Sequence, residues 1–229
     1  GQNQDAEIYF EKWQAQYSTD EKALVLFFLA IGRIRSSSFV KAQKYLISLF
    51  QIRNQLQLME SKVYVYQAFG FYRHFICRYK KSFYWAQKAW KQAVIADSDL
   101  GKFLSCDLWA HALFQLGEIE QGFSQLQKAK SLAKKNGRGS LVESLEISKI
   151  IYQAQFGINP LNQVTILQNK MKKIKSDADT YSKANLGLEL ARQHQLRGYV
   201  VAAEKVIESI QSDVFKGDHR RQRSQWYFR

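Results

Sequence analysis

Four histidines are the side chains of this sequence best suited to relaying a proton or holding a metal ion. They are His74, His111, His194 and His219, and none of them lies beside a pair of acidic residues. His74 and His111 are 37 positions apart, so neighbouring helices of a repeat with a similar period would bring them to one surface. A metal or proton-relay site at this pair is one interpretation, and hydrogen-bonded surface or groove histidines are the default one.

The other reactive side chains form no recognisable catalytic or metal-binding arrangement in the sequence. Both cysteines, Cys77 and Cys106, fall within helical patterns and lack metal-ligand spacing, so we expect two buried thiols. No glycine-rich phosphate-binding motif is present in the sequence. The sequence therefore predicts a protein that is not an enzyme and has no cofactor or metal. Its few cysteines also fit a reducing compartment such as the cytoplasm.

The composition of the 229-residue chain indicates a folded, helical protein. Hydrophobic residues make up 46% of it and aromatic residues 14%, which excludes a disordered chain. A single proline favours continuous helices over separate domains joined by linkers. The longest apolar run, 23–31, is far shorter than the roughly 20 residues of a membrane span. The net charge of +14 is compatible with nucleic acid, an anionic membrane surface or an acidic protein as partner.

Two helices predicted at 103–116 and 118–135, hinged at Gly117, carry the clearest pattern in the chain. Apolar and small residues recur in both at spacings of three and four, which is typical of amphipathic helices. Pairs of small residues lie 12 positions apart, one on the first helix of a hairpin and one on the second. Such residues allow the two helices to approach closely, because larger side chains would hold the helix axes apart. The pairs are Ala30 with Ala42, Ala110 with Gly122, and Ala191 with Ala203, and Gly70 with Ala86 is a longer version.

The first members of three of these pairs are evenly spaced along the chain. Ala30 and Ala110 lie 80 positions apart, and Ala110 and Ala191 lie 81 positions apart. With one further hairpin in each gap, this spacing indicates a repeat of about 40 residues, near the length of known helical repeats. We therefore expect an all-α fold, a solenoid of about five antiparallel helical hairpins.

The expected domain organisation follows from this repeat. A helix within 1–18 would cap the first hairpin, as repeat arrays require. The repeat domain would span 19–215, and 216–229 would be a basic and aromatic segment, either a capping helix or the start of a further helix. The repeats are expected at about 19–57, 60–97, 99–137, 140–175 and 177–213.

Local signals mark the ends of these predicted helices. Ser18 followed by Glu21 is an N-cap signal, and Ser176 with Asp177 would cap the fifth repeat. Serines at 36–38 mark one turn, and Gly137 suits a left-handed helix terminus. Asn159 and Pro160 would turn the fourth repeat into its second helix at 161–174.

The order of large and small residues resembles the tetratricopeptide repeat (TPR) family, most clearly in the first, third and fifth repeats. The matching residues of the third repeat are Trp109, Ala110, Leu113, Gly117, Ile119, Gly122, Leu126 and Ala129. The resemblance covers about 20–212. Its period of about 40 exceeds the usual 34 residues, and the closing proline is missing. HEAT or armadillo repeats, with periods of about 40–47 residues, remain an alternative.

The TPR resemblance implies that the solenoid is right-handed and that its inner helices line a concave groove that binds a peptide or protein segment. Amide side chains there would pair with a peptide backbone, and rings would pack against its side chains. Some groove positions would instead pack between repeats. By register, the groove positions are Gln67, Phe71, His74, Asp107, His111, Phe114, Leu188, Arg192 and Gln195.

A second candidate surface is a basic edge, formed by lysines near the ends of two predicted second helices. Stacked repeats would bring these ends side by side. Cations at helix C-termini complement the helix dipole and keep an array soluble, or they could bind phosphate groups or an acidic protein. The residues of this edge are Lys128, Lys134, Lys135, Lys172 and Lys173.

Together these patterns predict a peptide- or protein-binding interaction or sensor module, as a regulatory or scaffolding part of a larger protein with an attached effector. The alternative is a nucleic-acid-binding helical repeat that uses the basic edge, and an enzyme ranks third. The salt dependence of binding distinguishes the peptide-binding function from the nucleic-acid-binding one, because counterion release makes nucleic-acid affinity fall steeply as the salt concentration rises. We also expect no transmembrane segment, a cytoplasmic location, and exposed end repeats that would allow a homodimer.

Overall fold

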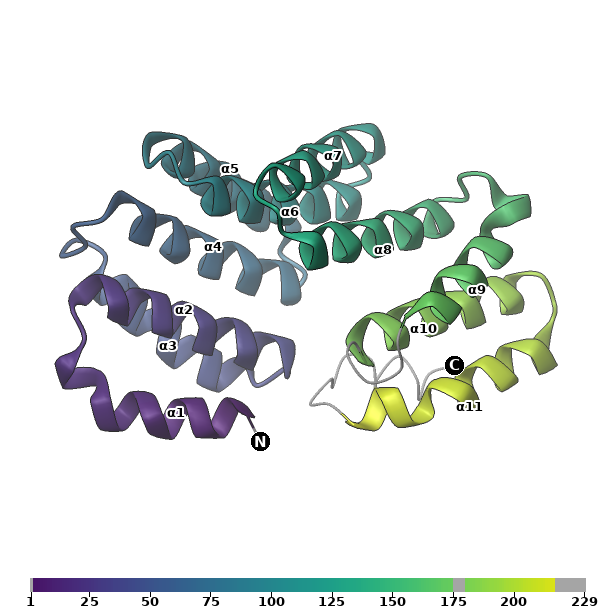
Figure 1. Cartoon of the computed structure of the whole chain (residues 1–229), viewed down its shortest axis with the longest axis horizontal. Helices are drawn as coiled ribbons and strands as arrows, with labels where there is room; N and C mark the ends of the chain where they lie inside the picture. The colour runs from purple at the N-terminus through teal and green to yellow at the C-terminus, as the bar shows by residue number, and fades with distance from the viewer. Residues whose placement is uncertain (1, 175–179, 217–229) are drawn as a thin grey trace. The chain divides into compact units, whose positions relative to one another are not determined.

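The described part of this protein consists of α-helices that follow one another along the chain (Figure 1). The computed structural model describes residues 2–174 and 180–216, and within these ranges it is helical throughout, without a strand. The expected all-α fold is confirmed at this level. The α-helices are α1 (Gln2–Trp13), α2 (Thr19–Arg35), α3 (Phe39–Ile52), α4 (Met59–Phe75), α5 (Tyr79–Ile95), α6 (Asp99–Gln115), α7 (Ile119–Lys135), α8 (Gly139–Gln155), α9 (Gln163–Lys173), α10 (Thr180–Leu196) and α11 (Val200–Lys216).

The chain divides into two compact units, the N-terminal unit at residues 1–139 and the C-terminal unit at 140–229. In the N-terminal unit each helix packs on the next along the chain, and α4 also packs on both α2 and α6. In the C-terminal unit α8, α9 and α10 share one apolar cluster, and α10 and α11 share another. Neither unit could bury its apolar residues without this stacking of neighbours.

In the described ranges, seven turns between helices have the same backbone geometry. Each places one residue in the left-handed region, and the amide N–H of the residue after it donates to a carbonyl five positions back, at 2.8–3.0 Å. This is the Schellman motif, which satisfies carbonyls left free at a helix C-terminus. The left-handed residues are Ser37, Cys77, Asp97, Gly117, Gly137, Gly157 and Gly198. Five of them, from Cys77 to Gly157, follow one another at a constant interval of 20 positions.

Replacing Cys77 with glycine is expected to raise the free energy of unfolding by about 1 kcal/mol. Cys77 has φ +58°, where a Cβ atom costs roughly 1–2 kcal/mol and glycine avoids that cost, although glycine also loses more entropy on folding. Chemical denaturation measures the change. The control Ala96→Gly, at a right-handed helix terminus, should destabilise, and a Cys77→Gly variant that is less stable than the parent would contradict this account.

Buried positions in the N-terminal unit repeat at twice the interval of the turns. The buried residues of α3, α5 and α7 form one stripe on each helix, at equivalent positions. Ala42, Ser82 and Gly122 are one such set, and they follow one another 40 positions apart. On α2, α4 and α6 the same interval relates Ala30, Gly70 and Ala110. Every residue of the four small-residue pairs predicted from the sequence is buried. The longer pairing of Gly70 with Ala86 was wrong, because the α4–α5 turn has the same length as its neighbours and Ser82, 12 positions after Gly70, takes the equivalent place. Turns therefore recur every 20 positions and equivalent buried residues every 40.

Several predicted helix ends move in the structure. The helix expected at 103–116 begins four residues earlier, because the Ser98 hydroxyl accepts from the N–H of Gly101 at 2.9 Å and caps α6 at Asp99. Its partner, expected at 118–135, begins at Ile119. Pro160 starts a short 3-10 turn, Pro160–Asn162, and α9 follows from Gln163. The N-cap at Ser18 is confirmed, with reciprocal hydrogen bonds to Glu21 of 2.8 and 3.3 Å.

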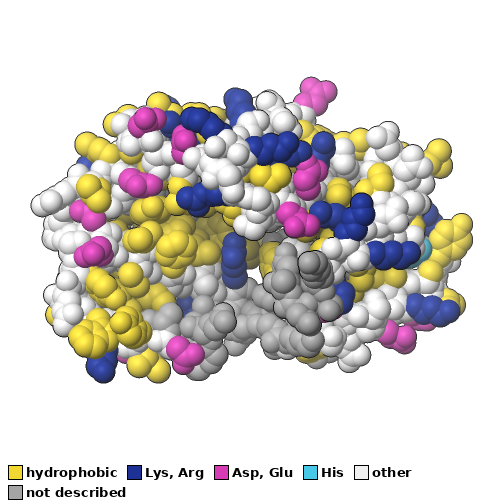
Figure 2. Space-filling view, viewed as in Figure 1, with side chains coloured by type: hydrophobic (Ala, Val, Ile, Leu, Met, Phe, Trp, Pro, Cys, Tyr) yellow, Lys and Arg dark blue, Asp and Glu magenta, His cyan; other side chains and the backbone are white. Residues whose placement is uncertain are grey.

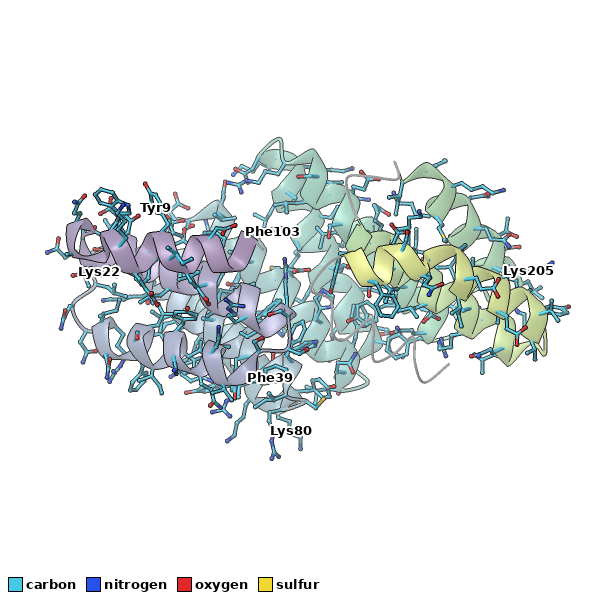
Figure 3. The ribbon with its side chains drawn as sticks, turned by 90° about the horizontal axis from the view of Figure 1, so that it is seen from below. Tyr9, Lys22, Phe39, Lys80, Phe103 and Lys205 are labelled. Atoms are coloured by element: carbon cyan, nitrogen blue, oxygen red, sulfur yellow. The ribbon has the colours of Figure 1, made fainter. Side chains whose placement is uncertain are left out.

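The N-terminal helix α1 packs on α2, and its large apolar residues differ in burial. Phe10 is buried and stacks on Tyr17 at 6.1 Å between ring centroids. Ile8 is 65% exposed, and Tyr9 points to solvent (Figure 3). A second attachment is ionic, because the carboxylate of Glu7 accepts two hydrogen bonds from the guanidinium of Arg33 on α2.

The two cysteines differ in exposure. Cys106 is buried as expected, and burial raises the pKa of its thiol to about 12. The expectation for Cys77 was wrong, because the thiol belongs to the α4–α5 turn and is exposed. The segment predicted at 216–229 and the cap at Ser176 and Asp177 lie outside the residues whose side chains are described. None of the helices in 2–174 and 180–216 combines the length and the hydropathy that crossing a membrane needs.

Candidate functional site

An unbroken series of side-chain contacts crosses α2, α4 and α6 in the N-terminal unit. We call it the inner row. Its members come from three helices that pack on one another although they are not consecutive along the chain. They are Arg35 of α2, Phe71, His74 and Phe75 of α4, and Asp107 and His111 of α6.

The aromatic end of the inner row joins α2 to α4. The guanidinium carbon of Arg35 lies 5.8 Å from the ring centroid of Phe71, and Phe71 stacks on Phe75 at 4.9 Å. These two rings are four residues apart, so one face of α4 carries both. Arg35 is exposed and both rings are half-buried. Figure 2 shows hydrophobic side chains gathered over the N-terminal unit, with single cations between them.

The polar end of the inner row joins α4 to α6 through two imidazole rings. His74 lies 6.0 Å from His111 between ring centroids, and Nε2 of His111 lies 3.4 Å from a carboxylate oxygen of Asp107. The side chains of His111 and Asp107 keep 27% and 29% of their surface exposed, whereas His74 is buried. The two histidines paired by their spacing in the sequence are therefore in contact. Within the described ranges no three His, Cys, Asp or Glu side chains converge as a metal site would require.

Two other predicted groove residues hold helices together instead of facing solvent. The side-chain amide of Gln67 donates to the hydroxyl of Ser105 at 2.9 Å and joins α4 to α6, with 3% of Gln67 exposed. Phe114, 2% exposed, packs edge-on against Phe123 of α7 at 4.8 Å. Both are inaccessible to a ligand in this structure. Helical register places them on the inner helices, but their side chains lie between neighbouring helices.

The three groove residues predicted in the fifth repeat belong to the C-terminal unit. Leu188 is 2% exposed and packs in the cluster between α10 and α11. Arg192 donates to the carboxylate of Glu189, which is 3% exposed, with its shortest contact at 2.7 Å. Gln195 is exposed. Of the three, Leu188 therefore stabilises the core and Arg192 compensates a buried charge.

The lysines of the predicted basic edge fall in both units and are described separately. Lys128, Lys134 and Lys135 are exposed on α7, and Nζ of Lys135 lies 3.5 Å from the carboxylate of Asp99. Lys172 and Lys173 are exposed in the last turn of α9. Lys134 and Lys135 lie in the last turn of α7 and Lys172 and Lys173 in that of α9, where cations complement the helix dipole, whereas Lys128 lies in the middle of α7.

The structure also contains a pocket that the sequence patterns did not reveal, which we call the outer pocket. It has a volume of about 500 Å³ and is lined by residues of α3, α4 and α5 and of the segment after α3. Four rings contribute, Phe50, Tyr66, Phe69 and Trp85. Three cations contribute, Arg53, Lys62 and Lys88, together with Asn54 and the buried Val65.

The rings of the outer pocket form a continuous wall. Trp85 stacks on Phe69 at 5.4 Å and on Tyr66 at 5.8 Å, and Phe50 meets Phe69 edge-on at 5.9 Å. The only hint in the sequence is local, with Lys62, Tyr66 and Phe69 on one face of α4 and Lys88 one turn after Trp85. Such spacing is also what a helix core requires, so it does not distinguish a pocket from a core.

No protein-family model matches the chain, and neither a curated protein nor a solved structure matches it. A function for this protein has to come from its own side chains.

Proposed function

We propose that this protein is a peptide- or protein-binding helical repeat, a right-handed TPR-like solenoid of about five hairpins. Its inner helices would hold an extended segment of a partner along the inner row. The regular interval of buried positions and the recurring Schellman turns support a repeat architecture. A repeat of this kind presents equivalent positions of successive helices on one surface.

The observation that carries the proposal is the chemical variety of the exposed part of the inner row. Arg35 offers a planar cation, Phe71 and Phe75 offer apolar rings, and His111 with Asp107 offers a donor and an acceptor. A peptide needs all of these, because its backbone presents N–H and C=O groups and its side chains alternate in character. A row made only of rings or only of cations would suit a narrower class of ligand.

Replacing Phe71 with alanine is expected to weaken peptide binding at least tenfold, because aromatic anchors dominate such interfaces. A random peptide library displayed on phage would be selected on the full chain, and fluorescence anisotropy would give the Kd of a selected peptide. His111→Ala should also weaken binding. Ile95→Ala removes a residue that is 69% exposed and lies outside the row, so it serves as the matched control and should leave the Kd unchanged.

Two results would refute the groove assignment. One is a selected peptide that binds the Phe71→Ala and His111→Ala variants as tightly as the parent chain, provided circular dichroism shows all of them folded. The other is a library that yields no binder at all.

The second candidate is nucleic-acid binding, and exposed lysines favour it. Lys128, Lys134, Lys172 and Lys173 are exposed and form no ion pair in the part of the chain that the structure describes. Binding to single-stranded RNA that falls steeply with salt, survives Phe71→Ala and is lost when Lys134 and Lys173 are changed to glutamate would favour this candidate over the peptide groove.

A further inference from the structure

We propose that the outer pocket binds a small aromatic anion, of which a nucleoside phosphate is the chemical type. The proposal does not depend on the inner row, because none of the inner-row residues lines the pocket. It rests on four features of the pocket, namely its rings, its cations, its size and the exposure of its rim.

The ring wall supplies a surface for the planar part of such a ligand. Trp85 and Phe69 lie 30° apart between ring planes, and Trp85 and Tyr66 lie 25° apart, so neighbouring faces are nearly parallel. A base packed on this wall would stack without regard to its hydrogen-bonding edge, since every base has a π face. The amide of Asn54 at the rim can both donate to and accept from such an edge.

Three cations surround the ring wall and leave the pocket strongly positive. Arg53, Lys62 and Lys88 come from different helices or helix ends, and no acidic residue is among the described side chains that line the pocket. Within residues 2–174 and 180–216 none of the three forms an ion pair with a carboxylate. A phosphate would therefore meet three positive charges that are not already neutralised, and guanidinium and ammonium groups are the usual phosphate ligands.

One acid on another helix interacts with a cation of the pocket and also holds backbone groups. Asp20 of α2 interacts electrostatically with Lys62. Its two carboxylate oxygens accept from the backbone N–H groups of Leu58 and Gln57, at 3.1 and 3.2 Å. Asp20 thus holds the start of α4 and does not line the pocket, whose described lining carries three cations and no acidic residue.

The size and rim of the outer pocket suit one small molecule. A volume of about 500 Å³ lies within the roughly 300–1,000 Å³ typical of small-molecule sites. Phe50 at the rim keeps 46% of its surface exposed, with the guanidinium of Arg53 3.5 Å from its ring centroid. Lys88 lies 5.6 Å from the ring centroid of Trp85. Rings and cations at this distance already attract each other, and a ligand with a ring and an anion would engage both at once.

Isothermal titration calorimetry of the full chain with AMP tests the proposal. We expect AMP to bind, with adenosine and inorganic phosphate each at least tenfold weaker because each offers only half of the recognised chemistry. Lys88→Ala should weaken AMP binding at least tenfold. Lys91→Ala removes the same charge from the same helix outside the pocket, so it should leave the affinity within about twofold of the parent.

The ring wall is tested by Phe50→Ala, which should weaken AMP binding at least fivefold, against Ile47→Ala on the same helix, which is 58% exposed and outside the pocket. Thermal unfolding checks that each variant folds. The proposal fails if AMP gives no saturable heat, if Lys88→Ala behaves like Lys91→Ala, or if phosphate alone binds as tightly as AMP. It also fails if a single-stranded oligonucleotide binds at this pocket and AMP does not.

Discussion

Replacing Glu7 with alanine is expected to lower the free energy of unfolding of the N-terminal unit by about 3 kcal/mol, because breaking a buried ion pair from one side leaves a desolvated charge. The side chains of Arg33 and Glu7 are only 8% and 12% exposed. The variant removes both of the hydrogen bonds that Arg33 donates to this carboxylate. It also removes the ionic attachment of α1 to α2. Urea denaturation followed by circular dichroism measures the loss.

Two variants make this result specific to the ion pair. Glu11→Ala removes an exposed acid from the same helix and should change stability by less than about 1 kcal/mol. Replacing Arg33 with methionine together with Glu7→Ala should cost less than the sum of the single changes, because no charge is then left buried. Equal losses for Glu7→Ala and Glu11→Ala would show that the pair contributes no more than a surface contact.

The same pair gives the protein an acid-sensitive contribution to stability. The hydrogen bond from Arg33 lowers the pKa of Glu7 below its ordinary value of 4.5, against the opposing effect of burial. A carboxyl group whose folded pKa is depressed stabilises the fold fully above its unfolded pKa, and this contribution is lost as pH falls through the folded pKa. The stability of the parent chain should therefore fall below about pH 4.5 by more than that of Glu7→Gln.

Replacing Gly122 with valine is expected to destabilise the N-terminal unit by about 3 kcal/mol, at the upper end of overpacking costs. A Cβ atom at Gly122 would lie 2.6–3.0 Å from three ring carbons of Phe114. Phe114 is itself 2% exposed and held by Phe123, so its ring has little room to move. The separation of α6 and α7 would have to increase. The midpoint of urea denaturation reports the change.

The position of the substitution, and not the loss of a glycine, should decide this outcome. Gly139→Ala places a Cβ where no other atom lies within 4 Å, and it should alter stability by no more than about 0.5 kcal/mol. Adding Phe114→Leu to Gly122→Val should recover part of the loss by making room. If Gly122→Val is as stable as the parent chain, the close approach of α6 and α7 at this position is wrong.

Small residues and turn residues carried most of the predictable part of the fold. The pairs Ala30 with Ala42 and Ala110 with Gly122 are buried as predicted, because a close helix contact tolerates no larger side chain. Gly117 and Gly137 mark turns in the left-handed region, as glycine favours. Cys77 was wrongly predicted to be buried within a helix, because no glycine marks its turn. A left-handed cysteine has no recognisable signal in a sequence, and its turn read as part of a helix.

Helical register predicted which site residues share a face of a helix, and it predicted nothing beyond that about the candidate sites. Phe71, Asp107 and His111 share equivalent faces of successive inner helices, so register alone predicts that they come together. Register could not tell that Gln67 would instead bond to Ser105. The outer pocket was out of reach because Phe50, Tyr66 and Trp85 come from three helices, and their convergence depends on the space left between α3 and α5. Nothing in the spacing of a single helix encodes that space.

The interval between equivalent buried positions, such as Ala42 and Ser82, also limits how a chain like this one can be lengthened by duplication. Copying the whole interval, from one turn to an equivalent turn, adds one helix of the α4 kind, buried on several sides, and one of the α5 kind, buried along a single stripe. Every copied side chain then meets the kind of neighbour it had before. Copying half of the interval, which is one helix and its turn, would preserve helix length and turn geometry. It would also place a helix of the α5 kind, buried along a single stripe, where a helix of the α4 kind packs against several neighbours. The whole interval is therefore the natural step of growth.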